Sequence, residues 1–413
     1  MRHYILLIVI MIFISGCKKE ETPEPEPQQD EIMKINFTNG YIPDPFEVIV
    51  FISNPDGSLI ADTAFSENGL HSVMNENPEI DIPDTFMVTI VRYDLYWHSL
   101  LIRMNTFQGV SPSEWAIRGM EPDTIGKATV EFTSIPEFSG LVLYSNQGYY
   151  NYTTSTNPQT CMIYDAQDDF YLKMKTDVNG PRFKWMDGFT AGSHYVLDLE
   201  SMEIPNSTTI PFPFEAGYYE GRLWGFADNS FDLGKAFLFD LVLAGIEPKN
   251  EIILNYPSGR YENYRTNIMI RESFFNNALY FFNTTGAIPS SLPLIDAEIT
   301  GAQMSENEII LLANGNFETQ KAFLYFMSAN NEIFEWNIYA PSSAEKIYIP
   351  DLSPLLGATF PSIDTADFVL KNTELIDFHE LNSFREMLQV MFDKNNPLNL
   401  DQLDYSSVSR LEQ

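Results

Sequence analysis

Apolar and polar residues follow one another along this chain in short runs that are typical of β-strands. From about Lys34 onward, runs rich in Val, Ile, Phe and Tyr are separated by Asn, Asp, Gly, Pro and Ser, as in successive antiparallel strands. Strands are expected at residues 46–52, 86–93, 99–106, 128–133, 141–145, 170–175, 236–243, 251–255, 267–272 and 278–282. Helical periodicity is almost absent, so the pattern favours β-sandwiches or barrels over a parallel α/β sheet.

One hairpin can be predicted in detail. The apolar run 46–52 is followed by Asn54-Pro55-Asp56-Gly57 and then by Ser58-Leu59-Ile60. Asp-Gly tolerates the positive φ that hairpin turns require, so these residues predict a strand, a tight turn and a return strand.

One short helix is predicted near residues 383–393. Ser383 and Glu386 have the spacing of a capping box, and Phe384, Leu388 and Met391 follow at helical spacing. Asn395-Asn396-Pro397 closes the segment. The apolar stripe of this helix should pack onto a β-domain.

The fold class expected is mainly β, with several antiparallel β-sandwich-like domains in tandem and one short C-terminal helix. The predicted segments are a signal peptide at 1–17, a Pro/Glu-rich tether at 18–33 and β-domains at 34–121, 122–206, 207–289 and 290–413. Residues 183–199 and 334–352 resemble each other, since each contains a Phe-x-Trp and a later Tyr-x-x-Asp-Leu. Their separation of about 150 residues fits either domain duplication or the convergence of strand patterns.

The N-terminal residues have the pattern of a targeting sequence. Arg2 and His3 precede an apolar run from Tyr4 to Ile14, which is too short to span a membrane but fits the core of a signal peptide. The run ends in Ile14-Ser15-Gly16-Cys17, which resembles the lipobox of bacterial lipoproteins. This resemblance implies that Cys17 is acylated and becomes the first residue of a lipid-anchored protein, with palmitate among the acyl chains expected. An uncleaved anchor that ends in Cys is the alternative.

The residues after Cys17 are predicted to form a tether. Pro and Glu alternate there, so the segment can form neither a helix nor a core and should stay extended and solvated. An acidic stretch next to the lipidated Cys is similar to the export signal of Bacteroidota lipoproteins, which implies an outer-membrane anchor facing the cell surface. An ordinary periplasmic spacer is the alternative.

Charge and cysteine content narrow the function classes. The chain has 413 residues, with 24 Lys and Arg against 57 Asp and Glu, a formal net charge of −33. Binding to nucleic acid by neutralising phosphates is therefore not expected. Cys161 is the only thiol besides Cys17, so no internal disulfide is expected, and Cys161 should pack as a small hydrophobic residue.

Motifs for catalysis and cofactors are missing from the sequence. It contains no H-E-x-x-H, P-loop, G-x-S-x-G or dinucleotide-binding fingerprint. No enzymatic activity and no cofactor are therefore predicted. One loop has the oxygen-rich spacing of a calcium site, although Pro397 and Leu398 depart from the EF-hand pattern; its candidate ligands are Asp393, Asn395, Asn399, Asp401 and Asp404.

Aromatic residues are the remaining candidates for binding. Residues 146–158 are a long uncharged segment, expected to be a loop between strands, that contains Tyr149, Tyr150 and Tyr152, and Trp97 lies in a second aromatic segment. Flat rings stack on sugar faces while amides and hydroxyls bond the sugar's OH groups. Core or cross-strand packing is the alternative for all of these residues.

Together, these patterns favour a non-catalytic binding or adhesion module for glycan or protein, attached to the membrane by its N-terminal lipid. Two alternatives remain: a structural accessory subunit of an outer-membrane assembly, and a hydrolase that uses carboxylates brought together in space. The oligomeric state cannot be predicted from the sequence.

Overall fold

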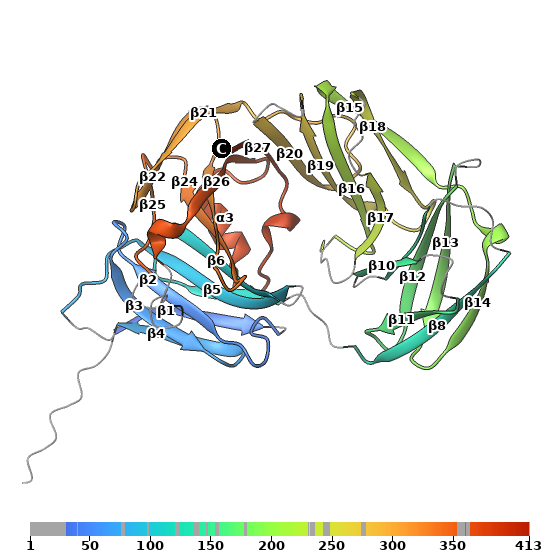
Figure 1. Cartoon of the computed structure of the whole chain (residues 1–413), viewed down its shortest axis with the longest axis horizontal. Coiled ribbons are helices and arrows are strands. Elements are labelled where there is room, and N and C mark those ends of the chain that lie inside the picture. Colours follow the sequence, from blue (N-terminus) through green and yellow to red (C-terminus); the bar gives the residue numbers. More distant parts are fainter. Residues whose placement is uncertain are drawn as a thin grey trace, which may run out of the picture.

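The computed structural model confirms a mainly β protein made of several sheets. It describes residues 30–38, 40–75, 79–96, 99–119, 124–134, 140–145, 148–152, 157–176, 180–229, 231, 236–242, 248–273, 278–352, 360 and 364–412. The chain forms an arch in which N-terminal and C-terminal strands share one lobe, while residues from the middle of the sequence form the other (Figure 1).

A twelve-stranded sheet runs through the arch. Its strands, in spatial order, are β17 (Ala236–Val242), β16 (Tyr218–Phe226), β19 (Asn263–Arg271), β20 (Ala278–Gly286), β27 (Tyr405–Leu411), β26 (Val369–Phe378), β23 (Thr319–Met327), β24 (Ile333–Pro341), β6 (Ser99–Val110), β5 (Phe86–Tyr96), β2 (Val48–Ser53) and β3 (Leu59–Phe65).

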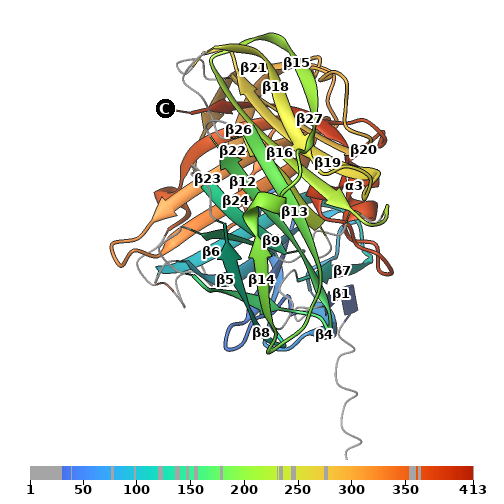
Figure 2. The ribbon, with the colours of Figure 1, turned by 90° about the vertical axis from the view of Figure 1, so that its right-hand side faces the viewer.

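Smaller sheets complete the layers. Two lie in the N-terminal and C-terminal lobe: β4 (Gly69–Asn75), β1 (Asp30–Thr38) and β7 (Glu114–Arg118), and β21 (Ala297–Met304), β22 (Glu308–Gly315) and β25 (Ile347–Tyr348). The middle of the chain forms β10 (Gly148–Tyr152), β9 (Gly140–Ser145), β12 (Asp168–Thr176) and β13 (Gly180–Phe189), and also β11 (Gln159–Ile163), β8 (Gly126–Thr133) and β14 (His194–Asp198). A two-stranded sheet joins β15 (Asn206–Ala216) to β18 (Lys249–Tyr256), and both strands lie above the middle sheets (Figure 2).

The burial of β2 explains why its sequence is a continuous apolar run. Every residue of this strand is buried, because alternate side chains enter different cores. Val48 and Val50 pack in a core with β1 and the C-terminal helix, whereas Ile49 and Phe51 pack in a second core with β24. The large sheet is therefore covered on both faces at this strand.

The predicted hairpin is confirmed. Strands β2 and β3 pair antiparallel, and the Asp56 carboxylate accepts hydrogen bonds from the Ser58 amide and hydroxyl at 3.0 and 2.7 Å. Gly57 has a φ of 95°, and an added Cβ would lie 3.0 Å from the Ile349 carbonyl oxygen. Both the conformation and the close approach therefore require glycine.

The predicted helix is also confirmed. The one α-helix in the described part of the chain is α3 (Phe384–Met391), and the Ser383 hydroxyl accepts a hydrogen bond from the Glu386 amide at 3.2 Å. The Glu386 carboxylate accepts from the Asn382 amide at 2.8 Å, one residue before the position that a capping box would use. The helix is too short to cross a membrane, as is every other helix among the described residues.

Aromatic residues join the middle sheets to the rest of the arch. Tyr171 of β12 packs against Phe239 of β17, with ring centroids 5.3 Å apart. Beside them, the guanidinium of Arg260 stacks over the Trp185 ring at 4.4 Å and pairs with the carboxylates of Asp169 and Asp187. This junction combines apolar burial with a paired cation that remains partly exposed to solvent.

Among the described strands, three pairs are parallel: β1 with β7, β8 with β14, and β6 with β24. The β6–β24 pair places strands from the predicted segments 34–121 and 290–413 in one sheet, and β20 adds a strand from 207–289 next to β27. The boundaries between these segments remain predictions.

Two details differ from the sequence-based picture. Strand β1 begins at Asp30 and buries Ile32 and Met33, so the core begins inside the segment predicted as tether. Trp336 is fully buried in the interior strand β24, whereas Trp185 is half-buried on β13 at a sheet edge. The two similar segments therefore occupy different positions, and whether they are a true repeat stays open.

Candidate functional site

A row of polar side chains crosses three neighbouring strands on one face of the large sheet. Arg222 of β16 lies opposite Asn267 of β19, and Asn267 lies opposite Asn283 of β20. Residues directly opposite one another share a face, as do residues two apart in one strand, so Arg265 of β19 joins this row.

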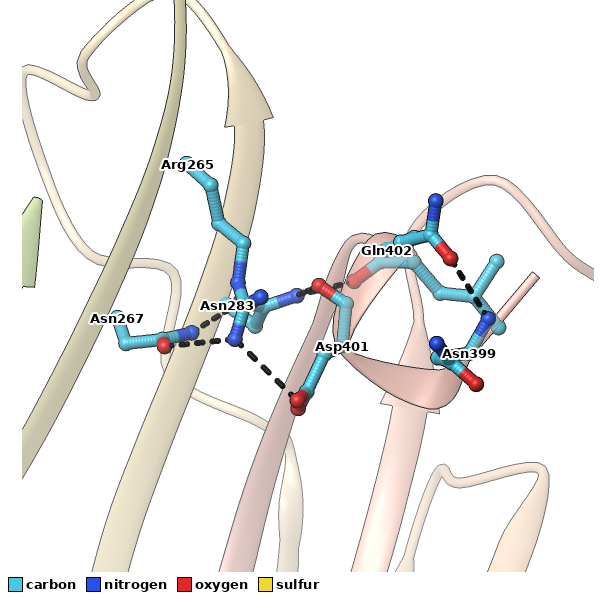
Figure 3. Close-up of polar contacts among 7 residues, drawn as sticks. Arg265, Asn267, Asn283, Asn399, Asp401 and Gln402 are labelled. Atoms are coloured by element: carbon cyan, nitrogen blue, oxygen red, sulfur yellow. Dashed lines mark hydrogen bonds and ion pairs between the residues drawn. The ribbon is translucent and has the colours of Figure 1, made fainter. Parts of the chain in front are cut away.

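Arg265 is the centre of the row. It is only 3% exposed, and its guanidinium donates to Asn283 Oδ1 from Nε at 3.1 Å and to Asn267 Oδ1 from Nη2 at 3.0 Å (Figure 3). Its Nη2 also lies 3.5 Å from Asp401 Oδ2, and the group stacks over the Trp224 ring at 4.5 Å. The buried Nη1 has no hydrogen-bond partner among the described residues.

The positive charge of Arg265 is only partly compensated. Burial lowers its pKa from the ordinary value, because removal from water disfavours the charged form. The Asp401 carboxylate opposes this shift, and the nearby positive charge of Arg222 adds to it. Since the Asp401 side chain is 49% exposed, solvent weakens the ion pair between Arg265 and Asp401.

Asn283 fixes the position of Asp401. Its Nδ2 donates to the backbone carbonyl oxygens of Asp401 and Leu403, at 3.0 and 2.5 Å, and its Oδ1 accepts from Arg265 and from Asn267. The short 3₁₀ turn η4 (Leu400–Gln402) is thereby held against the sheet. Since Asn283 is fully buried, these bonds are shielded from water.

Two further contacts hold the same turn in place. The Asp404 carboxylate accepts hydrogen bonds from the amide and hydroxyl of Thr285, at 2.6 and 2.5 Å. The Asn399 amide donates to Gln402 Oε1 at 2.9 Å (Figure 3). The turn that carries Asp401 is therefore fastened at both ends.

A cavity of about 240 Å³ opens beside this network. Arg265 and Asp401 line it together with Arg222, Met269 and Phe281. Two cations, an acidic acceptor and two apolar side chains thus meet in one hollow. Such a mixture of apolar walls and a few polar groups is typical of small-molecule sites.

A second carboxylate, from Glu220, lines the same cavity and accepts a hydrogen bond from the Tyr218 hydroxyl. Burial raises the pKa of Tyr218 to about 12, and the bond to Glu220 adds to this effect. Tyr218 therefore stays protonated and remains a donor to Glu220 at neutral pH.

The polar face continues beyond Asp401. Lys321 of β23 lies 3.1 Å from the Glu374 carboxylate of β26, which also accepts from the Ser407 hydroxyl. Burial opposes the charge of Lys321, but Glu374 together with Tyr339 and Asp401 outweighs the effect of burial and raises the pKa of Lys321. Lys321 therefore stays charged, and the pair extends the network across the sheet.

The five candidate calcium ligands are not brought together by the fold. Asp393 caps the amides of Asn395 and the following residue, whereas Asp401 faces Arg265 and Asp404 faces Thr285. Asn399 lies at the start of η4. Among the described residues, no group of three or more His, Cys, Asp or Glu side chains could hold a metal ion.

The aromatic candidates differ from expectation in their backbone. Tyr149, Tyr150 and Tyr152 do not lie on a loop: they belong to strand β10, which pairs with β9 at the edge of its sheet. The side chains of these tyrosines, and all of Trp97, lie outside the described residues.

The structure tests the prediction for one of the two cysteines. Cys161 is fully buried in the core of the middle sheets with Val130 and Leu143, so the expected packing as a small hydrophobic residue is confirmed. Cys17 lies outside the described residues, and its lipidation stays a prediction.

A larger cavity, of about 500 Å³, lies between the turn after β6 and helix α3. The stacked rings of Trp115 and Phe392, 3.9 Å apart, stand at its base, and Arg385 and Lys394 lie among its lining residues. None of the sequence-predicted site residues except Asp393 lines it.

Comparisons with known proteins add little. No family model matches this chain, and no curated protein matches it. Among solved structures, a chain described as the Bacillus anthracis TIE protein is 10% identical, and the match covers 83% of this chain and 75% of that chain. Its TM-score of 0.14 carries no argument about fold or function.

Proposed function

We propose that this chain is a lipid-anchored lipoprotein of the cell envelope that acts as a non-catalytic binding module for glycans, through the cavity beside Arg265. The observation that carries the proposal is the mixed lining of this cavity, where Arg222 and Asp401 offer hydrogen bonds opposite the apolar side chains of Met269 and Phe281. Sugars need both kinds of contact, since their rings have apolar faces and polar edges.

The anchor rests on Cys17 and the residues before it. Acyl chains on that cysteine would hold the protein in the outer membrane, with the binding cavity on the part of the chain that projects beyond the tether. The surface-facing orientation is inferred from the acidic tether alone.

One wall of the cavity, the turn that carries Asp401, is held in place by hydrogen bonds, and this supports a role in binding without catalysis. Asn283 and Thr285 fasten the turn that carries Asp401, so one wall is held in place before a ligand arrives. A preorganised wall lowers the ordering cost of binding.

The proposal can be tested with the full-length chain in detergent on a panel of polysaccharides and matrix proteins. Phe281→Ala, which removes one apolar wall, is compared with Tyr149/Tyr150/Tyr152→Ala and with Arg385→Ala, an exposed control on α3. We expect saturable glycan binding that Phe281→Ala weakens at least tenfold while the melting temperature shows that the protein is folded.

Loss of binding only in the tyrosine variant would move the site to β10. Binding to no polysaccharide, together with co-purification of an envelope protein, would favour the accessory-subunit alternative.

A further inference from the structure

We propose that the cavity beside Arg265 selects a sugar that carries a carboxylate, and that Arg222 is the residue that contacts it. This inference rests on the proposed glycan-binding function and names the chemical class of the ligand.

Two guanidinium groups share the face that borders the cavity. Arg222 lies opposite Asn267, and the next residue on the same face of β16, Trp224, lies opposite Arg265. Arg222 is exposed and makes no ion pair in the part of the chain that the structure describes. Like charges held near each other repel, so an anion between them would be stabilised by both.

Each carboxylate in the cavity already has one partner. Asp401 is paired with Arg265, and Glu220 accepts from the Tyr218 hydroxyl. The groups left to meet a ligand are therefore mainly the donors of Arg222, whose planar fork matches a carboxylate with two parallel hydrogen bonds. The buried charge of Arg265 lies behind this contact.

The remaining walls suit one sugar ring. The volume of about 240 Å³ is smaller than sites for drug-sized ligands, which are about 300–1,000 Å³. Phe281 and Met269 can pack on a ring face, while free lone pairs of Asp401 and Glu220 can accept hydroxyl protons.

The charge of the whole chain limits the ligand further. A net charge of −33 repels long polyanions. A single acidic residue on an otherwise neutral glycan avoids most of this repulsion, because charges more than about 8 Å apart are screened at physiological salt.

The test compares two matched monosaccharides with the full-length protein in detergent. Methyl glucuronide and methyl glucoside differ only by a carboxylate in place of a hydroxymethyl group. We expect the glucuronide to bind at least tenfold more tightly, since hydrogen bonds to charged groups are the stronger ones. Arg222→Ala should abolish this preference, whereas Arg385→Ala, which removes an equal charge from α3, should keep it.

Other outcomes overturn the inference in distinguishable ways. Equal affinity for both sugars, with loss of both in Phe281→Ala, would leave glycan binding intact and refute the carboxylate. Competition by inorganic sulfate or phosphate as strong as that by the glucuronide would show an anion site without sugar selectivity. Failure of both sugars and of the whole polysaccharide panel would refute the proposed function together with the inference.

Discussion

The carboxylate of Asp401 lies 3.5 Å from the guanidinium of Arg265, although the two residues belong to distant parts of the sequence. Their contact depends on Asn283, which donates to the backbone of the turn that carries Asp401 and accepts from Arg265. One amide therefore serves as the link between the sheet and the wall of the cavity.

Asn283→Ala should be strongly destabilising. The change leaves two backbone carbonyls and Arg265 Nε without their partner, and an unsatisfied buried polar group costs about 1–3 kcal/mol. We expect the free energy of unfolding in urea to fall by about 2–4 kcal/mol in total. Asn395→Ala, at an exposed position, is the control and should change stability by less than about 0.5 kcal/mol. Equal effects of both substitutions would contradict the role of Asn283.

Loss of the stacked Arg260 guanidinium should destabilise the junction between the middle sheets and the rest of the arch. Arg260→Ala removes the contact with Trp185 and both ion pairs, to Asp169 and Asp187. We expect a loss of about 1–2 kcal/mol, with faster hydrogen exchange in β12 and β13. Arg260→Lys should recover only part of the loss, because an ammonium lacks the planar stacking surface. Unchanged exchange in both variants would show that the aromatic cluster alone fixes the junction.

Asp168 gives stability a dependence on pH. Its carboxyl is buried at the start of β12, and burial raises its pKa above the ordinary value, although the amides of Tyr164 and Asp165 oppose the shift. The folded state therefore favours the protonated form, and this contribution is complete below the ordinary pKa and is lost as pH rises through the folded pKa.

Asp168→Asn removes that titration and keeps an acceptor for the Tyr164 amide. In urea unfolding from pH 3 to 7, we expect wild type to lose stability relative to this variant as pH rises. Asp81→Asn, at an exposed position in another part of the chain, is the control and should run parallel to wild type. A constant difference between wild type and Asp168→Asn across this range would refute the shift.

The N-cap of helix α3 can be tested by a substitution that removes a single oxygen atom. Ser383→Ala removes the hydroxyl that accepts from the Glu386 amide, and loss of an N-cap costs about 0.5–2 kcal/mol. A lower melting temperature is expected, with Ser383→Asp close to wild type because Asp is also a good N-cap. Identical melting of all three proteins would mean that packing of Phe384 and Met387 alone holds the helix.

Lipidation is tested at Cys17. Cys17→Ser should move the protein from the membrane fraction to the soluble fraction and abolish labelling with radioactive palmitate, since the thioether to lipid needs a thiol. Cys161→Ser, at the other cysteine, should leave labelling unchanged. Labelling that persists in Cys17→Ser would refute the lipobox.

Local patterns predicted fewer than half of the strands in the described part of the chain, and of their pairings only the β2–β3 hairpin. The hairpin at Gly57 and the helix after Ser383 could be predicted because turn and cap chemistry is determined by residues within a few positions. The parallel pair of β6 and β24 could not, because a strand's sequence does not specify its neighbour in a sheet.

The candidate site was missed for the same reason. Arg222, Arg265, Asn283 and Asp401 come from four separate elements, and in the sequence each looks like an ordinary polar residue of a strand or turn. Polar residues at alternate positions of an otherwise buried strand, as at Arg265 and Asn267, are the one signal that could have indicated it. The calcium-like spacing of acidic residues did single out Asp401, but as a metal ligand and not as the partner of Arg265.

The parallel pairing of β6 with β24 also determines how late in synthesis the large sheet can be completed. Trp336 donates to the hydroxyl of Thr106 at 2.8 Å across 230 residues of sequence, in a fully buried contact. During synthesis, the edge of β6 that pairs with β24 therefore stays unpaired until most of the chain has been made. A truncated product that ends before β24 would keep that edge open, and an open strand edge is a template for aggregation. The last third of this chain thus protects the first third from self-association.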